Sequence, residues 1–94
     1  MSIEDKLKEL GIELQTPPSP VANYIPVQQT GNLIYLSGQG PRDEEGNFIT
    51  GKVGADISAE QAYDLSRNTA VNLISAMKSY LGSLERAEKI VKVF

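Results

Sequence analysis

The chain has 94 residues and a net charge of −3 at pH 7, with nine Lys and Arg against twelve Asp and Glu. This length allows a single domain, and the scattered basic residues argue against nucleic acid as a partner, because phosphate binding uses clustered Lys and Arg. The sequence contains no Cys and no His. Disulfides, thiolate nucleophiles, imidazole bases and the commonest metal ligands are therefore excluded, and we expect neither a metal nor a cofactor.

The N-terminal segment is charged and lacks the apolar core of a signal peptide. No apolar run approaches the roughly 20 residues that a membrane-spanning helix needs. From these features the sequence predicts a cytoplasmic protein with no membrane partner.

A short helix is predicted over residues 3–10. Ser2 is a suitable N-cap, and acidic residues follow in the first turn, where the helix dipole favours them. Gly11 is expected to end this helix. The proline-rich segment 16–20 can neither continue a helix nor enter a sheet interior, so it is predicted to be an extended connector.

A β-hairpin is predicted over residues 22–37. Its first strand contains Pro26, which cannot donate to a ladder and so places this strand at an edge or a bulge. A tight turn is expected at residues 30–32, and the apolar run at 33–37 is the second strand, predicted to be buried. Residues 48–49 are a candidate for a short third strand.

A long helix is predicted over residues 59–81. Ser58 with Gln61 three residues later forms a capping box, and Gly82 supplies the stop. Apolar side chains recur along the helix at steps of three or four residues, as one face of a helix requires.

The last predicted element is a strand over residues 90–94, rich in Ile, Val and Phe. Strands separated by a helix that packs on them indicate an α+β fold. Few strands are available to cover so long a helix, and the final apolar strand would present an unpaired edge. We therefore expect residues 1–94 to be one domain that is the N-terminal part of a larger one, truncated after this strand, and to associate through that edge.

The best candidate site in the sequence is Ser37-Gly38-Gln39, where the second strand ends. Polar groups at the end of a strand can offer a hydroxyl and backbone amides to a ligand. The alternative is a purely structural role, in which the strand simply ends and the glycine serves the following turn. The motif alone favours this alternative. Arg42 is a nearby cation that we expect to be solvated.

The sequence resembles the Rid family, also called the YjgF/YER057c/UK114 family and often labelled endoribonuclease L-PSP. The resemblance is carried by Tyr24, by the run from Gly31 to Gln39, by the capped long helix and by the Lys-Val-Phe ending. The spacing between Tyr24 and Ser37 fits the family pattern without a gap. The N-terminal helix and proline-rich connector resemble a branch with a longer N-terminus.

The resemblance implies a chorismate-mutase-like, ferredoxin-like α+β fold and a homotrimer with ligand clefts between subunits. Its best-known members hydrolyse reactive imines and enamines to 2-keto acids and ammonia. Tyr24, Ser37 and Gly38 match cleft positions of the family, and Gln39 belongs to the same motif. The family's carboxylate-binding Arg and water-handling Glu would lie beyond Phe94, so we expect residues 1–94 alone to be inactive.

Three functions remain open from the sequence. The first is an imine or enamine deaminase, and the second is a trimer that binds a small carboxylate without turnover. The third is an endoribonuclease or translation inhibitor, which the acidic composition disfavours because RNA recognition uses basic and aromatic surfaces. An Arg that faces Ser37 from a later strand would distinguish the first from the second.

Overall fold

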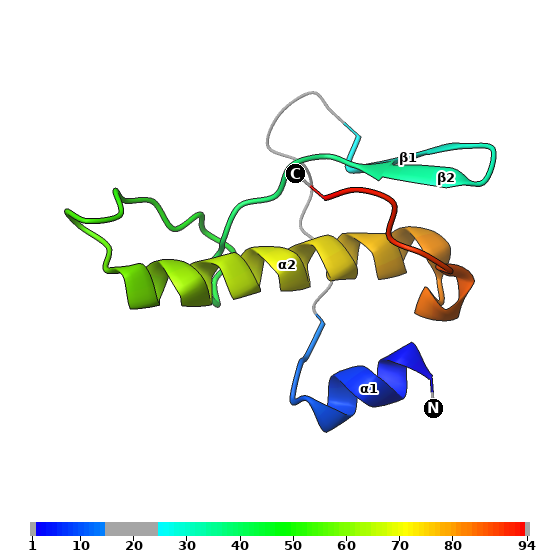
Figure 1. Ribbon diagram of the computed structural model, residues 1–94, viewed down its shortest axis with the longest axis horizontal. Coiled ribbons are helices and arrows are strands. Elements are labelled where there is room, and N and C mark those ends of the chain that lie inside the picture. The colour runs from blue at the N-terminus through cyan, green and yellow to red at the C-terminus, as the bar shows by residue number, and fades with distance from the viewer. Residues whose placement is uncertain (1, 15–24, 94) are drawn as a thin grey trace.

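The computed structural model describes residues 2–14 and 25–93. Its elements are α1 (Ile3–Glu9), β1 (Val27–Thr30), β2 (Leu33–Leu36), α2 (Ala59–Leu81) and a short 3₁₀ helix, η1 (Leu84–Arg86). Figure 1 shows α2 as the long axis of the molecule, with the hairpin of β1 and β2 on one side and α1 on the other. The predicted α+β class is confirmed.

The long helix α2 has the predicted bounds because both of its ends are specified locally. The Ser58 hydroxyl accepts from the Gln61 N–H at 3.1 Å, and the Gln61 side chain accepts from the Ser58 N–H at 2.8 Å. These two bonds satisfy backbone donors that the helix itself leaves unpaired. Gly82 ends the helix at a φ of 80°, a conformation that favours glycine.

The short helix α1 also follows its local signals. Ser2 caps it through a bond from the Asp5 N–H to the serine hydroxyl at 3.0 Å. Gly11, with a φ of 73°, follows the last turn as predicted. The connector predicted at residues 16–20 and the first residues of the predicted hairpin, 22–24, lie outside the described residues.

The hairpin pairs β1 and β2 in antiparallel register, with Val27 opposite Leu36 and Thr30 opposite Leu33. The predicted tight turn is confirmed as a two-residue loop. Gly31 adopts a φ of 58° at the first loop position, which L-residues rarely adopt and glycine does without penalty. Pro26 precedes the ladder, where a missing N–H is tolerated.

The prediction that the second strand is buried is wrong. Ile34 and Leu36 are half-buried, but Leu33 and Tyr35 are 45% and 59% exposed. Side chains alternate between the two faces of a strand, and only the face toward α2 is covered by described residues. The other face of the hairpin is open and partly apolar.

The third strand predicted at residues 48–49 is reduced to one isolated antiparallel bridge between Arg42 and Phe48. The turn between them is held by the Asp43 carboxylate, which accepts from the Glu45 and Asn47 N–H groups, both at 2.9 Å. These local bonds compete with extension of a ladder, so the segment stays a closed turn.

The strand predicted at residues 90–94 is also not formed over its described part. Residues 87–93 carry no regular secondary structure, and Ile90, Val91 and Val93 are exposed. Apolar β-branched residues favour a strand, but a strand also needs a partner, and none of the described strands pairs with this segment.

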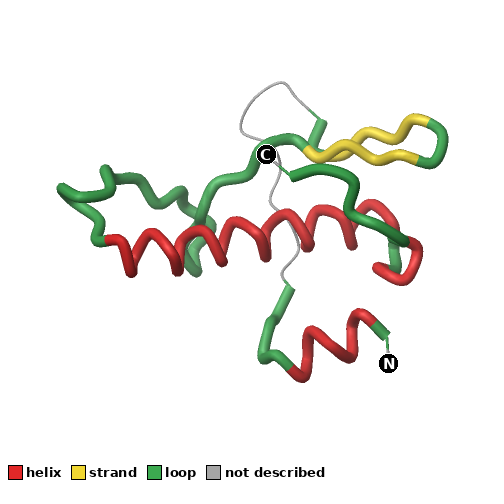
Figure 2. Tube along the Cα trace, in the orientation of Figure 1, coloured by secondary structure: helices red, strands yellow, loops and turns green. Residues whose placement is uncertain are grey.

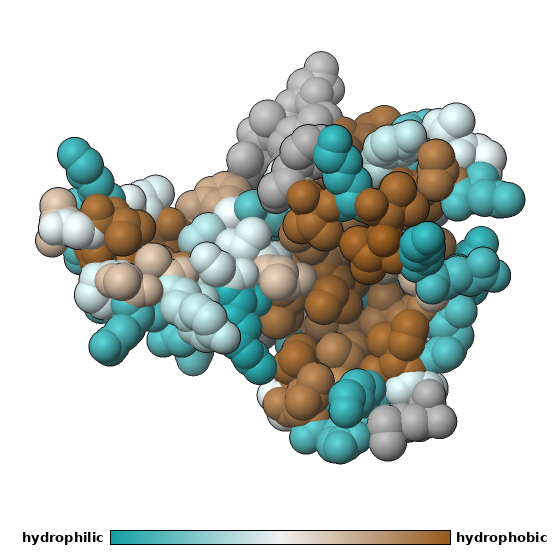
Figure 3. Space-filling model, in the orientation of Figure 1, coloured by the Kyte–Doolittle hydropathy of each residue, from teal (hydrophilic) through white to brown (hydrophobic). Residues whose placement is uncertain are grey.

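The core is small and lies around the C-terminal half of α2. Its buried apolar residues come from α1, β1, α2 and η1: Leu7, Val27, Ala76, Leu81 and Leu84. Helix α1 is attached through η1, where the Glu4 carboxylate accepts from the Leu84 N–H at 3.1 Å and the Glu85 carboxylate accepts from the Ile3 N–H. Figure 3 shows apolar residues gathered over this half of the molecule.

Candidate functional site

Ser37 stands at the exit of β2 and closes the hairpin. Its N–H donates to the Pro26 carbonyl at 2.8 Å, and its hydroxyl donates to the Ile25 carbonyl at 2.6 Å. The hydroxyl hydrogen is therefore used within the chain, and the oxygen is left as an acceptor for a ligand. The binding role predicted for Ser37 remains a prediction.

The backbone after Ser37 has three successive donors without an acceptor among the described residues. The N–H groups of Gly38, Gln39 and Gly40 form no hydrogen bond to any described residue. Gly38 is exposed, while Gln39 and Gly40 are half-buried. Buried amides are normally paired, so donors in this partly covered stretch are available to a ligand or to another chain.

Gly38 has open space beside it. A β-carbon built at this position would meet no heavy atom of the described residues within 4 Å, and the backbone of Gly38 does not lie in the left-handed region. Neither conformation nor crowding in the described residues requires glycine here. Close approach of a ligand or of another chain to the backbone is the remaining physical reason for a glycine.

Two asparagines of α2, which the sequence analysis did not single out, reach the segment that follows Gln39. The Asn72 amide donates to the Gly40 carbonyl at 3.0 Å, and the Asn68 side-chain oxygen accepts from the Arg42 N–H at 2.8 Å. The one sequence signal was two asparagines four residues apart inside a helix, where asparagine is a poor helix former.

The sequence predicts a solvated Arg42, but the structure shows this side chain packed against its own loop. It is half-buried, and its guanidinium lies over the ring of Phe48, 4.8 Å from the centroid. A cation over an aromatic face is attracted by the ring quadrupole. This stacking and the bridge between the two residues hold Arg42 against its own loop.

The structure thus keeps Ser37, Gly38 and Gln39 together at the strand exit, with Gly40 tied to α2. Tyr24, the fourth predicted ligand residue, lies outside the described residues. Figure 2 shows the long loop between β2 and α2, which begins with this motif and runs to the start of the helix.

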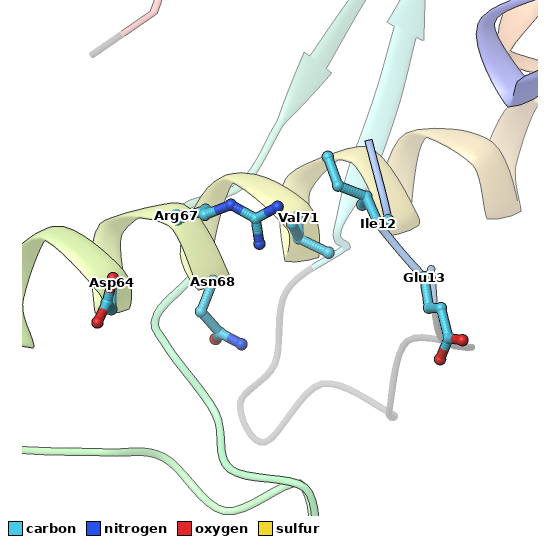
Figure 4. Close-up of a pocket in the computed structure, with 7 residues that line it drawn as sticks. Ile12, Glu13, Asp64, Arg67, Asn68 and Val71 are labelled. Carbon is cyan, nitrogen blue, oxygen red and sulfur yellow. The ribbon is translucent and has the colours of Figure 1, made fainter. Parts of the chain in front are cut away.

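A hollow of about 280 Å³ lies apart from this motif, between α2 and the segment after α1. In Figure 4, Arg67, Asn68 and Val71 come from the helix, and Ile12 and Glu13 from the other segment. It contains none of the predicted ligand residues. Its charged side chains carry both signs and are exposed, so its chemistry favours no particular ligand.

In residues 2–14 and 25–93, no group of three or more Asp and Glu side chains is placed to hold a metal ion. No helix of this part of the chain is long and apolar enough to cross a membrane.

The chain is similar to several known proteins, although no family model matches it. It is 32% identical over 87 residues to protein TCP17 of Trypanosoma cruzi, a match that covers 93% of this chain and 54% of TCP17. Among solved structures, a Shewanella oneidensis protein provisionally described as an endoribonuclease superposes with a TM-score of 0.84 at 30% identity. That match covers 92% of this chain and 57% of the Shewanella protein.

The chain shares the fold of the Shewanella protein. A structure of an Agrobacterium tumefaciens protein of unknown function also matches, with a TM-score of 0.72, 38% identity, and coverage of 89% of this chain and 50% of that one. The likeness agrees with the α+β fold that the sequence predicted. The chain spans about half the length of the relatives that it matches.

Proposed function

We propose that the chain belongs to the Rid family and that the protein containing it hydrolyses small imines or enamines to 2-keto acids and ammonia. The observation that carries the proposal is the motif at the exit of β2. Gly38 is open to approach, and three successive N–H donors from Gly38 to Gly40 have no acceptor among the described residues. Backbone amides of this kind suit the carboxylate of a 2-imino acid.

The chemistry suits a chain without histidine. An imine carbon is already electrophilic, so its hydrolysis depends on orientation of the substrate and of a water molecule more than on a strong base. In this proposal the Ser37 oxygen and the Gly38–Gly40 amides orient the substrate. The resemblance assigns the carboxylate-binding Arg and the water-handling Glu to positions after Phe94.

We also propose that the working form is a homotrimer with the ligand between subunits. The open face of the hairpin carries Leu33 and Tyr35, and a two-stranded hairpin is only marginally stable without further packing. A neighbouring subunit laid on this face would cover both side chains. Sedimentation of the natural protein at micromolar concentration should give the mass of three chains, and a monomer would contradict this assembly.

The test of the activity uses the natural protein that contains this sequence. A pyridoxal-phosphate dehydratase would generate an enamine in situ, and ammonia release would be followed with and without the protein. We expect faster ammonia release and no cleavage of a structured RNA. RNA cleavage without faster ammonia release would favour the endoribonuclease instead, the activity provisionally described for the Shewanella protein.

The same protein preparation distinguishes the hydrolase from the alternative, a trimer that binds a small carboxylate without turnover. Titration with 2-ketobutyrate, a stand-in for the product, measures whether a small carboxylate binds. Binding without any acceleration of ammonia release would contradict the hydrolase and leave a carboxylate-binding protein.

Ser37→Ala is expected to weaken binding of the imine substrate, whose N–H can donate to the Ser37 oxygen, by about 2- to 13-fold, the equivalent of roughly 0.5–1.5 kcal/mol for one hydroxyl hydrogen bond, and this is measured as a rise in KM for ammonia release. The substitution also removes the bond to the Ile25 carbonyl, so a modest loss of stability should accompany it. Ser37→Thr keeps a hydroxyl and serves as the control. Equal KM values for the alanine variant and the unaltered protein would remove Ser37 from the site.

A further inference from the structure

The segment that follows the proposed ligand motif is tied to α2 by a three-bond network. Asn72 Nδ2 donates both to the Gly40 carbonyl, at 3.0 Å, and to Asn68 Oδ1, at 3.2 Å. The same Asn68 oxygen accepts from the Arg42 N–H at 2.8 Å. Two side chains, one turn of helix apart, thus bind one carbonyl and one N–H of the same three-residue segment.

From this network we infer that Asn68 and Asn72 are positioning residues for the ligand motif. The inference rests on the proposed function, because it concerns the amides that would bind the substrate. Neither asparagine contacts those amides. They act through Gly40 and Arg42, whose backbone continues directly from Gly38 and Gln39.

The segment needs such a tie because regular structure does not hold it. The ladder of the hairpin ends at Leu36, and no helix or strand follows until Ala59. The other local restraints among the described residues are the bond from the Ile49 N–H to the Pro41 carbonyl and the bridge and ring stacking between Arg42 and Phe48. These restraints come from the same loop, so within the described part of the chain the asparagine side chains are what bonds the segment to the helix.

The geometry also explains why both residues are asparagine. Asn72 uses its two amide hydrogens as donors, and Asn68 uses its oxygen as a double acceptor. Alanine is the better helix former at either position. Both asparagines are half-buried, so each is retained in the helix interior for contacts that lie outside the helix.

Helix α2 offers a matched control residue, Thr69, which lies between the two asparagines in the chain. Thr69 is half-buried as well, but its hydroxyl donates to the Leu65 carbonyl at 3.1 Å, within the helix. Thr69→Ala therefore removes a polar side chain from the same turns without removing a hydrogen bond to the loop.

The experiment compares Asn72→Ala, Asn72→Asp and Asn68→Ala with Thr69→Ala in the natural protein. Hydrogen exchange of the Gly38, Gln39, Gly40 and Arg42 amides and kcat/KM for imine hydrolysis are measured together with the thermal midpoint. We expect Asn68→Ala to expose the Arg42 amide to exchange directly. Each asparagine variant should lose at least tenfold in kcat/KM, because a small misplacement of binding groups is enough to slow a reaction that depends on orientation.

Asn72→Asp should be at least as damaging as Asn72→Ala, since it sets carboxylate oxygens against the Gly40 carbonyl and the Asn68 oxygen. Thr69→Ala should leave exchange in the loop and kcat/KM unchanged.

Asparagine variants that match Thr69→Ala in exchange and in kcat/KM would overturn the inference. Absence of hydrolysis by the unaltered protein would instead contradict the proposed function. In that case the exchange comparison alone decides whether the asparagines hold the segment.

Discussion

Replacing Leu84 with alanine is expected to lower the free energy of unfolding by about 2–5 kcal/mol, the range for a buried leucine truncated to alanine. Leu84 is 2% exposed, the most buried apolar side chain of the described residues. It belongs to η1, which contacts both helices, and its N–H is bound by Glu4 of α1. The loss should therefore loosen α1 as well as the end of α2.

Urea denaturation followed by circular dichroism measures this effect. Leu10→Ala is the matched control, because Leu10 is 56% exposed and its truncation should change the midpoint little. In a core this small, Leu84→Ala is expected to shift the midpoint strongly or to leave the chain unfolded under native conditions. Similar midpoints for the two variants would show that η1 is not the point where the helices join.

Filling the space beside Gly38 is expected to weaken ligand binding strongly without unfolding the protein. A β-carbon there would meet no heavy atom of the described residues within 4 Å, and the φ of Gly38 is accessible to other residues. Gly38→Ala, Gly38→Val and Gly38→Leu should therefore keep the thermal midpoint of the unaltered chain. Affinity for 2-ketobutyrate should fall in that order, by more than tenfold for valine and leucine, because the side chain occupies the space that the substrate needs.

Gly51→Ala provides the opposite control for this series. A β-carbon at Gly51 would lie 2.5 Å from the Ile57 side chain, so this variant should lose stability with little direct effect on binding. If the Gly38 variants keep full affinity for 2-ketobutyrate, the open space at Gly38 serves some other contact.

The parts of the fold that the sequence predicted well are specified within a few residues. The bounds of α2 follow from the capping pair Ser58 and Gln61 and from Gly82, all within one turn of its ends. The hairpin turn follows from Gly31 in the same way. Caps and tight turns are determined by local hydrogen bonds and by allowed φ values, which one sequence carries in full.

The errors concern features that depend on partners. The apolar run of β2 predicted burial, but burial of Tyr35 needs a second layer, and the described residues place none on that face. Residues 90–93 have strand composition, yet a strand exists only when another pairs with it. Side-chain pattern predicts which surfaces tend to be covered and does not identify what covers them.

The residues of the candidate site also fall into a part that the sequence predicts and a part that it does not. Ser37 to Gln39 could be found from the sequence because they are adjacent in the chain. The link from Asn68 to Arg42 spans 26 residues and that from Asn72 to Gly40 spans 32. No periodicity connects such positions, and only folding of the loop onto α2 brings them together.

We propose that the amides after Ser37 bind a small carboxylate of the imine or 2-keto acid class. Amide chemical shifts of the natural protein, recorded by NMR during titration with 2-ketobutyrate, test it most directly. We expect saturable shifts of the Gly38, Gln39 and Gly40 amides. Shifts confined to the residues that line the hollow between α2 and the segment after α1, or no saturable shift at all, would contradict this proposal.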